Sequence, residues 1–290
     1  MKVTGFSFIR NAVNNDYPVV QAILSVLPVC DEFVIAVGDC TDNTLELIEG
    51  IGSPKIKIIH TIWDESIREG GRTFAQETDK AYAAISKDTD WAFYIQGDEC
   101  VHEKYLPVIK KAMEDNLKDV KVEGLLFNYL HFYGSYDYVG VSKRWYRNEI
   151  RIIRNNKKIK SYRDAQGFRL NDCKLNVKAV NAYIYHYGWV KHPNKQQEKA
   201  KTFNKLWHDD DWMKTNIPEA NEFDYTQIDA LDNFKETHPE VMKRRIAQMN
   251  WKFSFDPTKM NLKGKYLLTF FIEKYTGYRI GEYKNYKLLK

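Results

Sequence analysis

The sequence predicts an α/β fold in which a mainly parallel central sheet has helices on both faces. Short strand-like runs of aromatic and β-branched residues alternate with helical patterns from residue 3 to residue 116. Such alternation implies parallel strands joined by crossover helices that cover both faces of the sheet. The chain has 290 residues, of which 43% are hydrophobic, and is therefore long enough to bury the core of such a fold.

The first predicted elements follow one another in a regular order. Strands are predicted at 3–9, 33–37, 55–60 and 91–95, and helices at 18–27, after the GDCTDNT turn, at 73–86 and at 104–116. Pro18 suits the first turn of a helix, and Val19, Ile23 and Leu27 then fall on one helical face. The run FVIAV at 33–37 is uniformly apolar, which is typical of a strand buried on both faces.

The pattern changes after residue 120. Strand-like runs at 122–134, 149–155 and 182–190 are not separated by long helices, so we predict mixed or antiparallel strands that extend the sheet. From about residue 194 the sequence predicts helices, at 194–207, 225–235, 238–251 and 263–275.

Composition argues against several classes of protein. No apolar run approaches the roughly 18 residues that a membrane-spanning helix needs, and the N-terminal stretch MKVTGFSFIRN lacks the length and cleavage site of a signal peptide. The four cysteines stand far apart without a CxxC pair, which argues against a zinc site or a disulfide framework. We therefore expect a cytoplasmic protein.

Positive charge is concentrated near the C-terminus. The net charge is +5, and the segment 259–290 holds eight Lys or Arg against two Glu, together with seven Tyr or Phe. This mixture predicts either peripheral contact with the inner face of an anionic membrane or a terminal helix that packs its aromatic residues and solvates its lysines. The aromatic helices after residue 225 could also form a homodimer face. Nothing resembles a nucleic-acid-binding motif, so we expect no nucleic-acid partner.

Polar residues follow the predicted strands at the point where each one ends. Ligands bind beyond the carboxyl ends of parallel strands, so these residues should converge on one crevice. No GxGxxG follows the first strand and no GxxxxGK[ST] occurs, which leaves a dinucleotide fold and a P-loop without their key residues. The residues beyond the strand ends are Arg10, Asn11, Asp39, Arg72, Asp98 and Glu99.

Two stretches carry a family resemblance. Residues 7–44 read as strand, loop, helix, strand and the Asp-rich turn GDCTDNT, and Gln96-Gly97-Asp98-Glu99 ends a later strand. This order resembles the family 2 glycosyltransferases, which have the Rossmann-like glycosyltransferase A fold. In that family a DxD element stands where this chain has Gln96-Gly97-Asp98. The chain departs from that pattern at Gln96, where the family has the first acid, and is similar there to a bacterial branch with QxDE.

The resemblance covers residues 3–190 and implies a function. It implies a catalytic domain at 1–190, with a nucleotide-sugar half (1–118) and an acceptor half (119–190), and a helical extension at 191–290. The implied reaction moves a sugar from a UDP- or GDP-linked donor to a hydroxyl of a glycan or lipid-linked acceptor, with inversion, in surface glycan synthesis. Mg²⁺ or Mn²⁺ would stabilise the charge that develops on the leaving diphosphate.

The resemblance also assigns residues to the donor. Asp98 would bind the metal and diphosphate, Gly97 would let phosphate approach, and Glu99 would reach the metal through water or meet sugar hydroxyls. The competing interpretation of GDE is a surface turn. Asp39 would contact base or ribose, although Asp39 or Asp42 could instead cap the next helix. Arg10 and Arg72 would contact the nucleotide, although Arg72 could equally be a solvated loop residue.

Two later stretches supply the predicted acceptor side. In KSYRDAQGFRL, Asp164 is the candidate general base that takes the proton of the acceptor hydroxyl, with Glu149 and Asp172 as rivals. In AYIYHYGWVKHP, His186 would complete the metal shell or be a hydrogen-bonded core residue. Trp189 would stack on a sugar ring or belong to the core. The same stretch offers Lys191 and His192 as weaker candidates for the acceptor or diphosphate.

Two other functions remain open at this stage. A nucleotidyltransferase also uses a Rossmann-like half with metal-binding acids, but it usually needs a Gly-rich basic loop that IRNAVNND does not supply. The other function is a carbohydrate- or nucleotide-binding module without catalysis, which Gln96 favours because it replaces the first acid of the DxD element. Convergence of Asp164 and His186 on the crevice would count against such a module.

Overall fold

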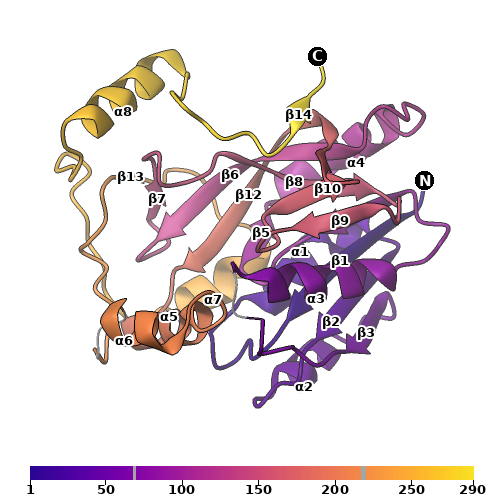
Figure 1. The fold of residues 1–290 in the computed structure, drawn as a ribbon, viewed down its shortest axis with the longest axis horizontal. Helices are drawn as coiled ribbons and strands as arrows, with labels where there is room; N and C mark the ends of the chain where they lie inside the picture. Colours follow the sequence, from indigo (N-terminus) through magenta and orange to yellow (C-terminus); the bar gives the residue numbers. More distant parts are fainter. Residues whose placement is uncertain (68–69, 217–219) are drawn as a thin grey trace.

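A layer of four parallel strands, in the order β3-β2-β1-β4, forms one half of the central sheet (Figure 1). The computed structural model describes residues 1–67, 70–216 and 220–290. The elements of this half are β1 (Val3–Ile9), α1 (Val19–Val26), β2 (Glu32–Val37), α2 (Thr44–Glu49), β3 (Ile56–His60), α3 (Arg72–Ala83) and β4 (Trp91–Tyr94). The strands and helices predicted for this half are confirmed, with small shifts at their ends.

The two faces of this layer are both buried. Along β2, Phe33, Ile35 and Val37 belong to a core shared with α1, α2 and the later helix α4 (Leu106–Asp115), because alternate side chains point to opposite faces. Val34 and Ala36 point the other way, into a second core with α3. A strand buried on both faces explains the uniformly apolar FVIAV run and confirms the predicted layered α/β class.

The second half of the sheet contains strands of both directions, as predicted. Its elements are β5 (Glu99–Val101), α4 (Leu106–Asp115), β6 (Gly124–Tyr133), β7 (Tyr138–Gly140), β8 (Asn148–Arg154) and β12 (Asn176–Trp189). Among the described strands of this sheet, β5, β7 and β8 are the ones that run against the others. A separate small antiparallel sheet is made of β9 (Ile159–Tyr162), β10 (Gly167–Leu170) and β11 (Cys173–Lys174).

The C-terminal segment is only partly helical. It contains α5 (Pro193–Asn204), α6 (Asp210–Asn216), β13 (Leu231–Asn233), α7 (Lys243–Ala247), α8 (Lys265–Thr276) and β14 (Lys287–Leu288). The prediction of a helix at 225–235 is wrong, because β13 there pairs antiparallel with the edge strand β7 and uses its open backbone groups. In the described ranges, no helix is both long and apolar enough to cross a membrane.

Strand pairing brings the end of β4 against β12. The antiparallel pair β5–β12 sets Glu99 opposite His186, and the Tyr187 amide donates a hydrogen bond to the Asp98 carbonyl at 2.8 Å. The GDE stretch therefore turns back along β12 instead of forming a free surface turn. Residues 87 to 89 positions apart in sequence meet at this point of the fold.

Candidate active site

A cavity of about 1190 Å³ lies where the carboxyl ends of the parallel strands meet. Its walls come from the end of β1, the segment after β3, the end of β4, the β9–β10 turn, β12 and α5. The predicted site residues in its lining are Arg10, Gly97, Asp98, Asp164, His186 and Trp189. Of the six residues that were expected to converge from the strand ends, Arg10, Asn11 and Asp98 line this cavity, whereas Asp39, Arg72 and Glu99 are absent from its described lining.

One end of the cavity is built around an arginine and a tryptophan. The Arg10 guanidinium donates to Asp39 Oδ2 at 3.0 Å and to Glu65 Oε1 at 2.8 Å, and lies 5.5 Å from the centre of the Trp63 ring. Asp39 Oδ1 accepts a hydrogen bond from the Trp63 amide at 3.2 Å. A Cβ on Gly38 would stand 2.6 Å from Trp63 Nε1, so only glycine lets the indole pack here.

Asp98 lies beside one histidine and two lysines. Its Oδ2 lies 3.8 Å from His186 Nε2 and 3.5 Å from Lys199 Nζ. Burial opposes ionisation, but positive charge nearby outweighs it, from His186 when that ring is protonated and from Lys199 and Lys191, so the pKa of Asp98 lies below its usual range. A Cβ on Gly188 would stand 2.7 Å from Asp98 Oδ2, which explains a glycine in β12 beside the carboxylate.

A second histidine fixes the tautomer of His186. His131 Nε2 lies 2.8 Å from the Tyr146 carbonyl, which can only accept, so this nitrogen carries the proton. Burial lowers the pKa of His131 and of His186, and both rings are therefore neutral. The 3.2 Å contact between their Nδ1 atoms then requires His131 to accept and His186 to donate. The His186 Nε2 lone pair consequently faces Asp98.

This arrangement fits a divalent ion shared with a diphosphate. A carboxylate oxygen and a nitrogen lone pair face each other across 3.8 Å, and a cation between them would relieve their repulsion. No group of three or more His, Cys, Asp or Glu that could hold a metal occurs among the described residues. Asp98 and His186 would thus be its two protein ligands, and phosphate and water oxygens would supply the others, as Mg²⁺ commonly requires.

Glu99 does not reach the cavity, which corrects the role predicted for it. Its side chain is fully buried and accepts from Arg151 at 2.7 and 2.9 Å and from the Tyr129 hydroxyl at 2.8 Å. Both carboxylate oxygens are therefore used inside the protein, where an ionised group needs such partners. Glu99 acts as a structural ion pair between β5 and β8, and its oxygens are turned away from metal and sugar.

The other donor-side residues differ in whether they line the cavity. Gly97 lines the cavity, but a Cβ there would stand 2.8 Å from Ile9 Cδ1, so packing against β1 is sufficient to require glycine. Arg72 is exposed as the first residue of α3, and the described lining of the cavity includes neither Arg72 nor Asp39. Asp39 instead acts on the site indirectly, because its carboxylate accepts a hydrogen bond from Arg10, which lines the cavity. Asp42 rather than Asp39 accepts from the Thr44 amide at the start of α2.

Asp164 occupies a constrained turn at the rim of the cavity. The residues on either side of it, Arg163 and Ala165, have positive φ angles of 55° and 64°, which non-glycine residues adopt at a cost. Gln166 Nε2 donates to Asp164 Oδ1 at 2.9 Å, and Gln96 Nε2 donates to the Ala165 carbonyl at 3.4 Å. Burial raises the pKa of Asp164 above its usual value. The turn thus presents a carboxylate with enhanced basicity.

The rivals to Asp164 are placed elsewhere. Burial raises the pKa of Glu149 to about 8, so this carboxyl is mostly protonated at neutral pH. It is also absent from the described lining of the cavity. Asp172 is exposed in the turn between β10 and β11.

Part of the cavity wall on β12 is aromatic. Trp189 lines it and also contacts Tyr133, Trp145 and Phe223, so this residue is part of both the wall and the core. Lys191 is fully buried and donates to the Asp16 carbonyl at 2.6 Å. His192 accepts from the Asn194 amide at the start of α5. Of these three residues, Trp189 is the one that faces the cavity.

Three residues that the structure brings to the site were missed by sequence reasoning. Trp63 follows β3, and the rule that placed Asp39 and Asp98 beyond strand ends could have found it. Lys199 lies inside α5 and His131 inside β6, and no local pattern distinguishes them from surface and core residues. Only the packing of α5 and β6 against β12 gives them a place beside Asp98 and His186.

Comparisons with known proteins find similar folds only. No family model and no curated protein matches the sequence. Similar solved structures include S. aureus TarS (14% identity, TM-score 0.40, covering 70% of this chain and 39% of that one). Another is the glucosyl-3-phosphoglycerate synthase of Mycobacterium tuberculosis with Mn²⁺, UDP and phosphoglyceric acid (15%, 0.31, 45% and 43%). A third is the 4-diphosphocytidyl-2C-methyl-D-erythritol synthase of Anaerococcus prevotii (13%, 0.39, 70% and 94%). Such similarity assigns no residue a role.

Proposed function

We propose that this protein is a glycosyltransferase that moves a sugar from a nucleotide-sugar to an acceptor hydroxyl, with inversion and with a divalent metal ion. The observation that supports it best is the single cavity that holds Arg10, Asp98, His186 and Asp164 at the carboxyl ends of the strands. It offers an aromatic and cationic end for a nucleoside, a metal-compatible pair for a diphosphate, and a carboxylate for an acceptor.

The donor would lie along the strand ends. Trp63 and the Arg10–Asp39 pair would contact the nucleoside, because they form the wall beyond β1 and β3. Asp98 and His186 would hold the metal ion, which when bound stabilises negative charge on the departing diphosphate. Lys199, 3.5 Å from Asp98, would add a fixed positive charge at the same place.

Asp164 would act as the general base. The acceptor hydroxyl oxygen forms a bond to the anomeric carbon while the bond from that carbon to the diphosphate oxygen breaks on the opposite face. The hydroxyl proton passes to Asp164, whose Oδ1 already accepts from Gln166, so Oδ2 is the oxygen placed to take it. The donor nucleotide would be UDP or GDP, and the acceptor a glycan or lipid-linked sugar in surface glycan synthesis.

Calorimetric titration with UDP and GDP, with and without Mn²⁺, tests this proposal. Wild-type protein should bind one of the two nucleotides, and chelation of Mn²⁺ should weaken binding. Asp98→Ala should remove the effect of Mn²⁺, since it deletes one of only two protein ligands. Asp115→Ala, an exposed acid on α4, is the matched control and should behave as wild type.

Each outcome of the titration has a distinct meaning. If nucleotide affinity is unchanged by Mn²⁺ and by Asp98→Ala, the cavity binds nucleotide without a metal ion, and the metal is removed from the proposal. If neither nucleotide binds under any condition, the proposed donor site is wrong, and a module with another ligand becomes the better interpretation. Binding without transfer or hydrolysis of any nucleotide-sugar would favour the non-catalytic module.

A further inference from the structure

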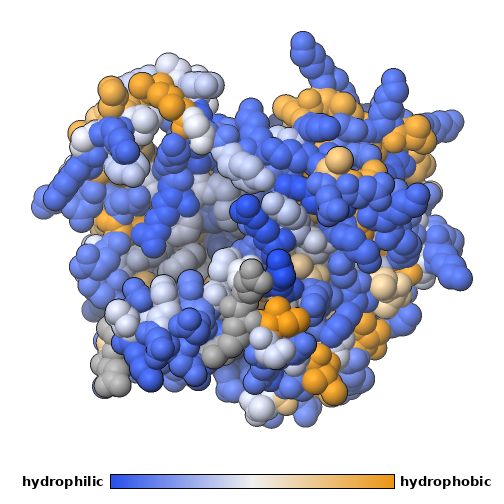
Figure 2. Space-filling view, in the orientation of Figure 1, coloured by the Kyte–Doolittle hydropathy of each residue, from blue (hydrophilic) through white to orange (hydrophobic). Residues whose placement is uncertain are grey.

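We propose that helix α8 is a docking surface for an anionic lipid bilayer. Seven of its twelve residues are aromatic or aliphatic, yet none of the twelve, all within the described range 220–290, is buried. Hydrophobic residues gather over α8 at the upper left of the molecular surface (Figure 2). This surface lies outside the large cavity, and the inference does not depend on the proposed function.

The outward side of α8 carries an apolar stripe. Leu268, Phe271 and Tyr275 are spaced by three and four residues, which places them on one face of the helix. Their exposed fractions are 63%, 38% and 78%. The Phe271 and Tyr275 rings are stacked, with centroids 6.2 Å apart. We call these three residues the α8 stripe.

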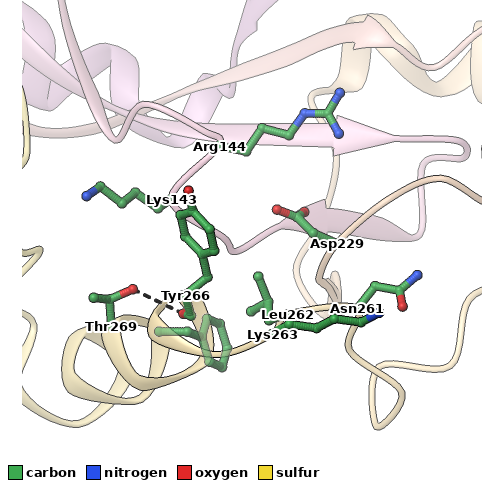
Figure 3. Close-up of a pocket in the computed structure, with 9 residues that line it drawn as sticks. Lys143, Arg144, Asp229, Asn261, Leu262, Lys263, Tyr266 and Thr269 are labelled. Carbon is green, nitrogen blue, oxygen red and sulfur yellow. Dashed lines mark hydrogen bonds between the residues drawn. The ribbon is translucent and has the colours of Figure 1, made fainter.

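The opposite side of α8 faces the protein. Tyr266 and Phe270 line a cavity of about 440 Å³, and Lys143 and Arg144 stand across it on the segment before β8 (Figure 3). At 100° per residue, these two aromatic residues lie roughly half a turn from the α8 stripe. The stripe therefore points away from the body of the molecule. Apolar residues on both sides also explain why α8 does not show a simple amphipathic pattern.

Lysines border the α8 stripe. Lys265 and Lys274 lie roughly a quarter turn from it, one on each side, as the same helical geometry requires. Glu273 is the only acid of α8 and lies on the inner side, where Arg279 Nε donates to both of its oxygens at 2.8 Å. The outer face of α8 thus combines apolar side chains with positive charge alone.

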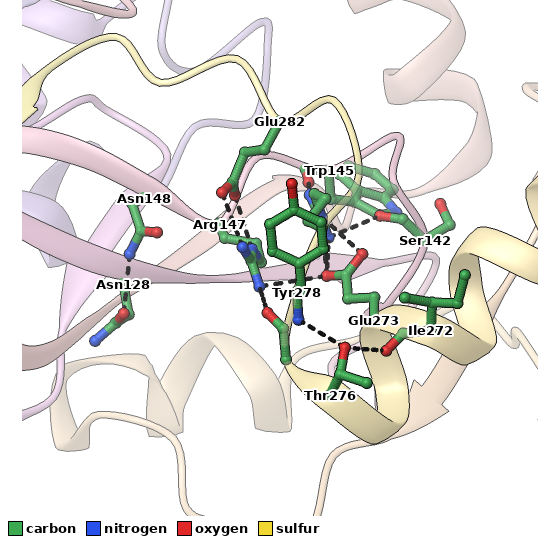
Figure 4. A network of polar contacts seen from close by, with 12 residues as sticks. Asn128, Ser142, Trp145, Arg147, Asn148, Ile272, Glu273, Thr276, Tyr278 and Glu282 are labelled. Carbon is green, nitrogen blue, oxygen red and sulfur yellow. Dashed lines mark hydrogen bonds and ion pairs between the residues drawn. The ribbon is translucent and has the colours of Figure 1, made fainter.

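Two arginines hold α8 against the sheet and neutralise the nearby acids, and Figure 4 shows one of them, Arg147, beside Glu282. Arg147, which immediately precedes β8, donates to Glu282 at 2.8 and 2.9 Å and to the Gly277 carbonyl at 3.0 Å. Arg279 pairs with Glu273 and also donates to the Trp145 carbonyl. Both glutamates of the segment 259–290 are therefore bound inward, and its remaining charged groups are basic.

Charge complementarity favours a bilayer as the occupant of this face. Aromatic and aliphatic side chains suit the boundary between headgroups and acyl chains, and flanking lysines meet anionic headgroups. A second copy would bring the same face against itself in a two-fold dimer, with lysines placed near lysines. An anionic membrane surface therefore complements both the α8 stripe and its lysines, whereas a second copy of this face would place like charges together.

Vesicle co-sedimentation of the full chain tests the inference. Wild-type protein should bind vesicles of equimolar phosphatidylglycerol and phosphatidylcholine, and should bind phosphatidylcholine vesicles much more weakly. Lys265→Gln with Lys274→Gln should weaken binding roughly twenty-fivefold, since each lysine near an anionic surface contributes about a factor of five. Leu268→Ser, Phe271→Ser and Tyr275→Ser together should weaken it at least about a hundredfold, because they remove the inserted apolar groups.

The matched control is Lys118→Gln with Lys121→Gln, two exposed lysines in the segment after α4. This control should bind the anionic vesicles as wild type does, and all variants should keep the wild-type thermal unfolding midpoint. Equal binding to both vesicle types, no binding, or full binding by the stripe variant would overturn the inference. Concentration-dependent self-association that the stripe variant abolishes would point instead to a second copy.

Discussion

At the scale of single residues, the site depends on which atoms are left available. Asp98 and His186 face each other with an oxygen and a nitrogen lone pair, and His131 determines which nitrogen of His186 is protonated. Glu99, the neighbour of Asp98 in sequence, has both oxygens occupied. Two adjacent carboxylates therefore have opposite roles, one facing the cavity and one fixed in the core.

His131→Phe should change the tautomer of His186. The variant removes the His131 nitrogen that accepts the hydrogen bond from His186 Nδ1, so the proton is no longer held on that atom. Because the His186 ring is then less firmly oriented, metal affinity should fall about 10–100-fold. His131→Asn should largely restore the wild-type state, because its side-chain oxygen can accept in place of Nδ1. Proton–nitrogen NMR of the histidine rings measures the tautomer without any assay of activity. An unchanged His186 signal in His131→Phe would contradict the assignment.

Asp164→Asn should lower the rate of sugar transfer by about 10²–10⁴-fold, since the amide cannot take the acceptor proton. Its affinity for nucleotide should stay close to wild type. Because burial raises the pKa of Asp164, the base is protonated up to a higher pH than an ordinary aspartate. Transfer by wild-type protein should therefore fall as the pH drops through that raised pKa, and this acidic limb should disappear in the variant.

The control for Asp164 is the exposed rival in the same region. Asp172→Asn should leave both the rate and its pH dependence unchanged, and steady-state kinetics across a pH series would show this. Full activity of Asp164→Asn would remove it as the base.

At the scale of elements, the site is assembled where strands of both directions meet. The pair β5–β12 returns the chain beside β4, and the Glu99–Arg151 ion pair joins β5 to β8 in the middle of the sheet. Arg151 is fully buried and also lies 5.2 and 5.3 Å from the centres of the Tyr94 and Tyr129 rings. This buried pair keeps the end of β5 in place behind Asp98.

Arg151→Met should destabilise the protein by about 3–5 kcal/mol, because it leaves the Glu99 carboxylate buried without its cation. Glu99→Gln should have an effect of similar size. The double variant should lose clearly less than the sum of the two, since neither charge is then left alone. Urea unfolding of the four proteins measures the cycle. Additive losses would mean that the two side chains do not act as a pair.

At the scale of the whole molecule, the two proposed sites are built from different parts of the chain. The large cavity is formed by strand ends together with α5. Helix α8 lies in the C-terminal segment, which is held to the rest of the protein by the contacts of Arg147 and Arg279 and by the pairing of β14 with β12 (Figure 1). Arg147 directly follows Tyr146, which lines the cavity. The segment that holds the end of α8 therefore continues directly into one wall of the cavity, while the α8 stripe points away from it.

Much of the fold could be predicted because its signals are local. Apolar runs and helical spacing located β1 to β4 and their helices, and the rule for strand ends placed Arg10 and Asp98 at one cavity. The segment 225–235 was predicted wrongly, since its apolar residues fit a helix while the open edge of β7 provides pairing for β13. Glu99 was also misplaced, because its partner Arg151 lies 52 residues away.

The sequence by itself determined the layered α/β class, the parallel first half, the mixed second half and the side of the sheet where a ligand would bind. These follow from periodicity and chain order, which are properties of neighbouring residues. The tertiary structure alone decided that Asp98 faces His186 while Glu99 is buried, that Lys199 and His131 join them, and that α8 keeps an uncovered face. Those outcomes depend on which distant elements pack together, because burial and lone-pair direction are set by contacts that no short stretch of sequence contains.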